Sequence, residues 1–137
     1  IAKDPVTRYI DDAMTMAKTD GLPPPVARRV IPGICRHAIE AACMESVRRR
    51  RLGRGEPHAA IEDLLAGAKG TKALAALALF DDPHRSGDVL SRLDKEAHAF
   101  ADTFRWCNEG AHETQAGPLV DQVRGTEKLA HWLRGRA

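Results

Sequence analysis

Three residues near the end of the chain have the types and spacing of a small catalytic group. Arg105, Glu109 and His112 follow one another at steps of four and three residues, which is the spacing of one face of an α-helix. Imidazole titrates near neutral pH and can move protons, and guanidinium is a permanently cationic fork. If the chain is an enzyme, we expect its chemistry in the segment Phe104–His112.

The helix that should carry this group begins near Asp88 and has two stripes at helical spacing. One is apolar, and the other contains His98, Asp102, Arg105, Glu109 and His112. Every surface helix needs a polar face, so Arg105 and Glu109 could simply be an exposed ion pair worth about 0.3–0.5 kcal/mol. His112 could be a capping or turn residue. For His98 and Asp102 we favour the ordinary polar face, with a supporting role as the alternative.

The spacing of Arg105 and His112 is not distinctive by itself. With four to six residues allowed between arginine and histidine, the pattern also occurs at Arg51/His58, Arg92/His98 and Arg124/His131. Frequent arginines and six histidines make such coincidences common. What distinguishes Arg105–His112 is a glutamate in step with both ends.

Composition predicts a single all-α domain. The chain has 137 residues, of which 43% are hydrophobic and 4% aromatic, so a core of Leu, Ala, Ile and Val is expected. A net charge of +2 argues against strong binding of polyanions by the whole molecule. Three cysteines without metal-ligand spacing suggest reduced, buried thiols and no metal. No signal peptide or apolar run of about 18 residues is visible, which favours a cytoplasmic protein without membrane contact.

The periodicity predicts a bundle of five to six helices. Residues 1–20 would form an N-terminal helix, or the tail of an upstream element in a longer protein, since the chain begins at Ile1. Residues 21–137 would form the helical domain. After a stiff Leu22–Pro25 linker, we expect helices from Val26 or Pro32 to Arg51, at Ala59–Ala68, at Thr71–Phe80, from Asp88 toward His112, and after Pro118.

The second helix ends in a run of arginines, for which two interpretations are open. Arg48, Arg49, Arg50, Arg51 and Arg54 could complement the dipole at a helix C-terminus that Gly53 or Gly55 caps. Alternatively, they could contact the phosphates of a bound RNA through bidentate forks. Four successive arginines point around the whole helix, so they cannot all serve one surface.

In its helical pattern and in the phrase Asn108-Glu-Gly-Ala-His112, the chain resembles HEPN domains. The text from Pro25 onward also looks like the C-terminal part of bacterial RecF/SMC-like AAA ATPases associated with phage defence. Many HEPN domains have a polar residue directly after the arginine. This chain has Trp106 there, and Asn108 lies two positions later as a candidate supporting residue.

The resemblance implies a metal-independent endoribonuclease without a cofactor, acting as the toxin-like effector of an antiviral system. Arg105 would bind the scissile phosphate, and His112 would serve as general base or acid. Glu109 resembles the acidic member of the Arg–Glu–His set in anticodon nucleases. Pairing of two protomers would complete the site. The implied partners are RNA, including tRNA, a second copy of the chain, and an ATPase in the same full-length chain or in a partner protein.

Two other functions remain open on the sequence alone. The chain could be a non-catalytic HEPN-like module for dimerisation or docking to a larger ATPase, with its polar stripe as the interface. Trp106 and the apolar Thr71–Phe80 helix motivate this alternative. It could also bind nucleic acid through the arginine run without cleaving it, with a steep dependence on salt. No Gly-x4-Gly-Lys-Ser/Thr loop is present, so ATP hydrolysis would have to come from elsewhere.

Overall fold

The longest helix, α2 (Pro24–Gly53), is the element against which most of the others pack. The computed structural model describes residues 3–110 and 118–135, and within these ranges the chain forms helices and no strand. The remaining helices are α1 (Pro5–Lys18), α3 (His58–Gly67), α4 (Thr71–Phe80), the 3₁₀-helix η1 (Pro83–Asp88), α5 (Val89–Glu96), α6 (His98–Glu109) and α7 (Leu119–Arg134).

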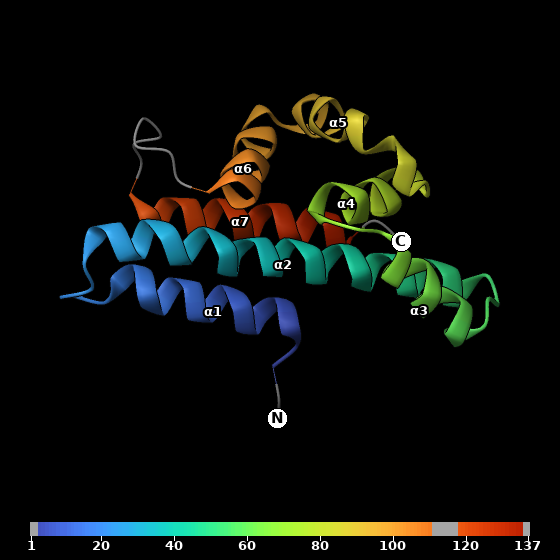
Figure 1. The fold of residues 1–137 in the computed structure, drawn as a ribbon, viewed down its shortest axis with the longest axis horizontal. Coiled ribbons are helices and arrows are strands. Elements are labelled where there is room, and N and C mark those ends of the chain that lie inside the picture. The colour runs from blue at the N-terminus through green and yellow to red at the C-terminus, as the bar shows by residue number, and fades with distance from the viewer. Residues whose placement is uncertain (1–2, 111–117, 136–137) are drawn as a thin grey trace.

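Helix α2 begins earlier and continues further than the sequence predicts. Pro24 and Pro25 form its first turn, where the missing N–H groups of proline would have no helical partner in any case. Pro32 neither begins the helix nor lies in its first turn; it is buried in the helix interior. At 30 residues, α2 is about 45 Å long and spans the molecule (Figure 1).

Helices α1 and α7 lie beside α2 along the long axis of the molecule (Figure 1). Asp4 caps α1 by accepting a hydrogen bond from the Thr7 backbone N–H at 3.0 Å. Val6, Ile10 and Ala13 of α1 are buried, and α1 contacts both α2 and α7. The first helix is therefore part of the same hydrophobic core as the rest of the bundle.

The segments from α4 to α6 form an arch over the other side of α2 (Figure 1). Helix α4 is almost wholly apolar, and its residues Leu74–Ala78 are buried in the core. Asp81 ends α4 in the left-handed conformation, with φ of 61°. The 3₁₀-helix η1 follows, and the Asp82 side chain caps it by accepting a hydrogen bond from the His84 N–H at 2.9 Å.

The prediction of one long helix from Asp88 toward His112 is wrong, and so is the predicted count of five to six helices. The structure has seven α-helices in the described residues, because Ala97 is extended, with φ of −159° and ψ of 128°, and separates α5 from α6. No glycine or proline marks this break. Helices α5 and α6 contact each other, but α5 otherwise contacts α4 and η1, whereas α6 contacts α2 and α7. Packing against these different partners overrides the local helical preference.

Helices α6 and α7 approach each other closely at Gly125. A Cβ atom added at Gly125 would lie 3.1 Å from Oγ1 of Thr103, a buried residue of α6. Gly125 lies in the middle of α7, where glycine weakens a helix by about 1 kcal/mol relative to Ala. It provides the space for the residue on the neighbouring helix.

The three cysteines lie in the core, as predicted, and are free thiols. Burial raises the pKa of Cys43 to about 12 and the pKa of Cys107 well above its ordinary value. Sγ of Cys107 lies 3.4 Å from Oγ1 of Thr126, which donates to the Gln122 carbonyl at 2.9 Å. This buried contact joins α6 to α7 beneath the exposed face of α6.

Among the described residues, no helix is both long and apolar enough to cross a membrane.

The contact at Gly125 can be tested by comparison with a helical glycine that has free space. We expect Gly33→Ala in α2 to stabilise the protein by about 0.5–1 kcal/mol, because nothing lies within 4 Å of the added Cβ. Gly125→Ala should give no such gain, since the Cβ crowds Thr103. Urea unfolding measures both, and adding Thr103→Ala should restore the gain at Gly125. An equal stabilisation by both single substitutions would contradict the proposed crowding.

Candidate functional site

The predicted Arg105 and Glu109 lie on α6, one turn apart, at its C-terminal end. The Arg105 side chain is 43% exposed, and Glu109 is exposed. Gly110, with φ of 81°, ends the helix and donates its N–H to the Trp106 carbonyl at 3.0 Å. Helix α6 therefore ends at Glu109, and His112, the third predicted catalytic residue, lies outside the described residues.

A chain of exposed polar contacts runs along α6 toward Arg105. Nδ1 of His98 lies 2.6 Å from Oδ1 of Asp94, and its Nε2 lies 3.6 Å from Oδ2 of Asp102. Asp102 in turn accepts a hydrogen bond from Nη1 of Arg105 at 3.1 Å. The hydrogen bond with Asp94, followed by the charge of Asp102, raises the pKa of His98. Asp102, three residues earlier on α6, is therefore a partner of Arg105.

The residues between Arg105 and Glu109 differ in the direction they face. Trp106 is only 2% exposed and belongs to the core, which explains why a polar residue is absent directly after Arg105. Asn108 is partly exposed. The burial of Trp106 and of the middle of α4 removes both features that suggested a docking interface in the sequence.

Three of the five predicted RNA-binding arginines converge on one carboxylate, Asp81. Arg50 and Arg51 each bond its Oδ1, at 3.0 and 2.8 Å, and Arg54 bonds Oδ2 at 3.0 Å. Arg50 also donates to the carbonyls of Leu77 and Ala78, both at 2.9 Å. Both carbonyls belong to the last turn of α4, where carbonyls lack partners inside the helix, and the Leu77 carbonyl also accepts the N–H of the capping residue Asp81 at 3.0 Å. The cluster thus joins the C-terminal ends of α2 and α4.

The same cluster perturbs the titration of Asp81. Partial burial alone would raise the pKa of this carboxyl, but hydrogen bonds from Arg54 and Arg51 and the charge of Arg50 lower it below its ordinary value. Arg50 and Arg51 are mostly buried, with 14% and 17% of their side chains exposed. Their role in the structure is to hold two helix ends together.

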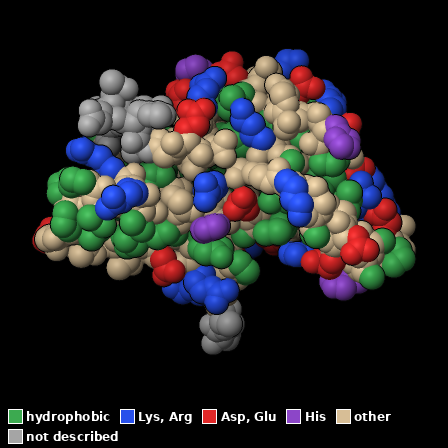
Figure 2. Space-filling model, in the orientation of Figure 1, with side chains coloured by type: hydrophobic (Ala, Val, Ile, Leu, Met, Phe, Trp, Pro, Cys, Tyr) green, Lys and Arg blue, Asp and Glu red, His purple; other side chains and the backbone are tan. Residues whose placement is uncertain are grey.

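Arg48 and Arg49 face other partners along α2. Arg48 forms a bidentate pair with Glu62 of α3, with both N–O distances at 2.9 Å, and this raises its pKa. Arg49 donates to the backbone carbonyl of Arg134 near the end of α7. Basic and acidic side chains alternate over the face that Figure 2 draws, without a broad basic patch.

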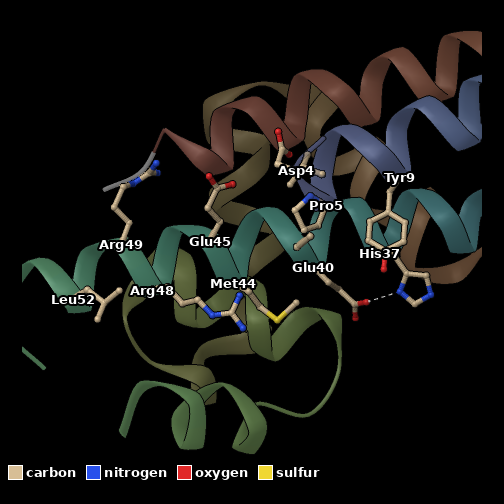
Figure 3. A pocket seen from close by; sticks show the side chains of 12 residues that line it. Asp4, Pro5, Tyr9, His37, Glu40, Met44, Glu45, Arg48, Arg49 and Leu52 are labelled. Atoms are coloured by element: carbon tan, nitrogen blue, oxygen red, sulfur yellow. Dashed lines mark hydrogen bonds and ion pairs between the residues drawn. The ribbon is translucent and has the colours of Figure 1, made fainter. Parts of the chain in front are cut away.

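A groove that the sequence did not reveal lies on α2 beside the start of α1 (Figure 3). Its volume is about 690 Å³. We call it the α1–α2 groove; it is lined by Asp4, Pro5, Val6 and Tyr9 of α1 and its cap, and by His37, Glu40, Ala41, Met44, Glu45, Arg48, Arg49 and Leu52 of α2. The α2 residues recur at steps of three and four, but their mixture of charged and apolar types gives no recognisable stripe.

Comparison with known proteins gives no match for this chain, whether against protein-family models, curated proteins or solved structures.

The Asp81 cluster predicts a defined dependence of stability on pH. We expect Asp81→Asn to lower the free energy of unfolding by about 1–2 kcal/mol at pH 7, a modest loss because water screens the partly exposed pairs. Asparagine tolerates the left-handed backbone at this position, so the change isolates the charge. Because the pKa of Asp81 is lower in the folded state, its contribution is complete above the unfolded value near 4 and is lost as pH falls through the folded value.

Chemical denaturation between pH 7 and pH 2 measures this contribution. The difference in unfolding free energy between wild type and Asp81→Asn should shrink as the pH falls below about 4. Asp82→Asn is the matched control, since the neighbouring Asp82 caps η1 and makes no contact with the arginines. A difference for Asp81→Asn that stays constant over this range would contradict the ionic role of the carboxylate.

Proposed function

We propose that the chain is a HEPN-like, metal-independent endoribonuclease domain that acts as an effector in bacterial defence. The observation that carries the proposal is the exposed pair of Arg105 and Glu109 at the C-terminal end of α6. The two residues lie one turn apart, immediately before the segment that contains His112. The neighbouring phrase Asn108-Glu-Gly-Ala-His112 and its resemblance to HEPN domains support the same function.

The reaction would be attack of an RNA 2′-hydroxyl on the adjacent phosphorus. The O2′–P bond forms and the P–O5′ bond breaks, leaving a 2′,3′-cyclic phosphate on one product and a 5′-hydroxyl on the other. His112 accepts the proton of the attacking hydroxyl or donates one to the leaving oxygen. Arg105 stabilises the charge that grows on the phosphate. Glu109 orients the imidazole or shares its proton, and Asn108 supports the site.

For this reaction, Arg105 must exchange Asp102 for a phosphate. Both side chains are substantially exposed, at 43% and 60%, and an exposed ion pair contributes only about 0–1 kcal/mol. The exchange therefore costs little. His98 and Asp94 support the pair indirectly, because they hold Asp102 from the other side.

In this proposal, the exposed arginines of the run also bind RNA. Arg48 and Arg54 expose 41% and 54% of their side chains and can reach a phosphate while keeping part of their bonding. A guanidinium has five N–H donors, and the pair of Arg48 with Glu62 uses two of them. Arg50 and Arg51 are committed to Asp81 and to the end of α4.

Substitution of the proposed catalytic histidine tests the activity directly. We expect His112→Ala to lower the rate of RNA cleavage at least a hundredfold, because it removes the proton-transfer group, and Arg105→Ala to do the same. Circular dichroism should show unchanged helix content in both. His84→Ala, which removes an exposed histidine of η1, is the matched control and should retain the activity.

The products and the metal requirement complete that test. The cleaved RNA should carry 2′,3′-cyclic phosphate and 5′-hydroxyl ends, and excess EDTA should leave the rate unchanged. Cleavage that survives His112→Ala, or that stops with EDTA, would contradict the assignment. A folded dimer that leaves RNA intact under all conditions would favour the non-catalytic module.

If a phosphate replaces Asp102 at Arg105, removing the charge of Asp102 should change the affinity for RNA. Asp102→Asn should strengthen RNA binding about two- to fivefold, corresponding to the roughly 0.5–1 kcal/mol of an exposed pair, and should preserve cleavage. Asp94→Asn is the control, because Asp94 contacts His98 but not Arg105. Fluorescence anisotropy with a short labelled RNA measures both variants, in the His112→Ala background to prevent turnover. Weaker binding by Asp102→Asn would mean that Asp102 orients Arg105 instead of competing for it.

A further inference from the structure

The α1–α2 groove follows a continuous strip of helix surface. His37, Ala41, Met44, Arg48 and Leu52 recur at steps of three and four along α2, which places them on one face. From His37 to Leu52 this face is about 22 Å long, or four helical turns. It runs past the first turn of α1 at Asp4 and Pro5, as Figure 3 shows.

The strip exposes more apolar surface than a solvated helix face requires. Leu52 is 49% exposed and Tyr9 is 36% exposed, and these are two of the three large hydrophobic side chains that the described residues expose. Between them lie Ala41 and Met44 from α2, with Val6 from α1. An elongated apolar trough between helices, with its axis along one of them, is the shape that receives an amphipathic helix.

Charges at the two ends of the groove restrict what such a helix can carry. Arg48 and Arg49 lie beside Leu52 at one end, and Glu40 and His37 lie at the other, near Tyr9 (Figure 3). Asp4 and Glu45 also line the groove, but Arg134 pairs with both of them, at 3.4 and 2.7 Å. Glu40 and Arg48 or Arg49 are eight or nine residues apart, or about 12–14 Å along α2. Arg48 and Glu40 already have internal partners, Glu62 and Thr71, but both arginines retain further N–H donors.

We propose that the α1–α2 groove binds an amphipathic helix of a partner protein. That helix presents apolar side chains at i, i+3 or i+4, and i+11, a span of about 16 Å that matches Ala41, Met44 and Leu52 on α2. It carries an acidic residue that meets Arg48 and Arg49, and a basic residue eight or nine positions away that meets Glu40. Since α6 contributes no residue to the groove, a bound helix leaves the exposed face of α6 open, and the proposal does not depend on ribonuclease activity.

A synthetic helical peptide provides the probe. It has about 16 residues, leucines at the three anchor positions, a glutamate at the end that faces Arg49 and a lysine nine positions away. We expect it to bind the intact chain with a Kd in the micromolar range, measured by fluorescence anisotropy, and to bind at least tenfold more weakly when its two charges are exchanged. Leu52→Glu should also weaken binding at least tenfold.

Matched variants distinguish binding in the groove from nonspecific binding to exposed apolar side chains. Val30→Glu alters an exposed apolar residue of α2, 38% exposed, that does not line the groove, and it should bind the peptide like the wild type. Arg49→Glu should weaken binding, and replacing the peptide glutamate with lysine should restore it. Thermal melts confirm that each variant is folded.

Several results would overturn the proposal. They are a probe that does not bind below 1 mM, equal binding of both charge arrangements, or equal losses from Leu52→Glu and Val30→Glu. Sedimentation of the free chain gives a further test. If the chain self-associates and Leu52→Glu abolishes that association, the groove is an interface between two copies, and a partner helix is not its occupant.

Discussion

The fold depends on how closely other helices can approach α2. Its buried face consists largely of small side chains, and Cys35, Ala38, Ala42, Cys43 and Ser46 are all completely buried. Small residues bring helix axes close together and leave room for the larger side chains of neighbours. Helices α1, α4, α6 and α7 all contact α2, and Phe104 and Trp106 of α6 are buried against this framework. The position of the exposed face of α6 thus follows from the packing of its opposite face on α2.

Periodicity predicted the helices well because burial of an apolar stripe is a local property of the sequence. The range of α4 equals the prediction, that of α3 is displaced by one residue at each end, and α1 lies inside the predicted range 1–20. The break at Ala97 could not be predicted in the same way, since no residue there disfavours a helix and the cause lies in the different partners of α5 and α6. HEPN-likeness stays a proposal, because an all-α bundle is compatible with many topologies.

Helical periodicity also made part of the candidate site predictable. A period of 3.6 residues puts Arg105 and Glu109 on one face of α6, and the glycine at position 110 marks the end of that helix. The partners of the arginine run were beyond such reasoning: Arg50 and Arg51 bond Asp81, about thirty residues along the chain, and Arg48 bonds Glu62. A run of like charges in a sequence says nothing about which distant carboxylates neutralise it.

The structural use of these arginines has a consequence for the proposed ribonuclease. RNA binding takes most of its strength from cations that neutralise phosphates, yet the net charge of the chain is only +2. Arg50 and Arg51 bond Asp81 at the end of α4, and Arg105 shares the exposed face of α6 with Asp102, while Asp94 at the end of α5 pairs with His98. One protomer therefore offers a phosphate little cationic surface near Arg105. A site assembled from two copies would double the arginines around one phosphate, so the charge balance gives a physical reason to expect that cleavage requires a dimer.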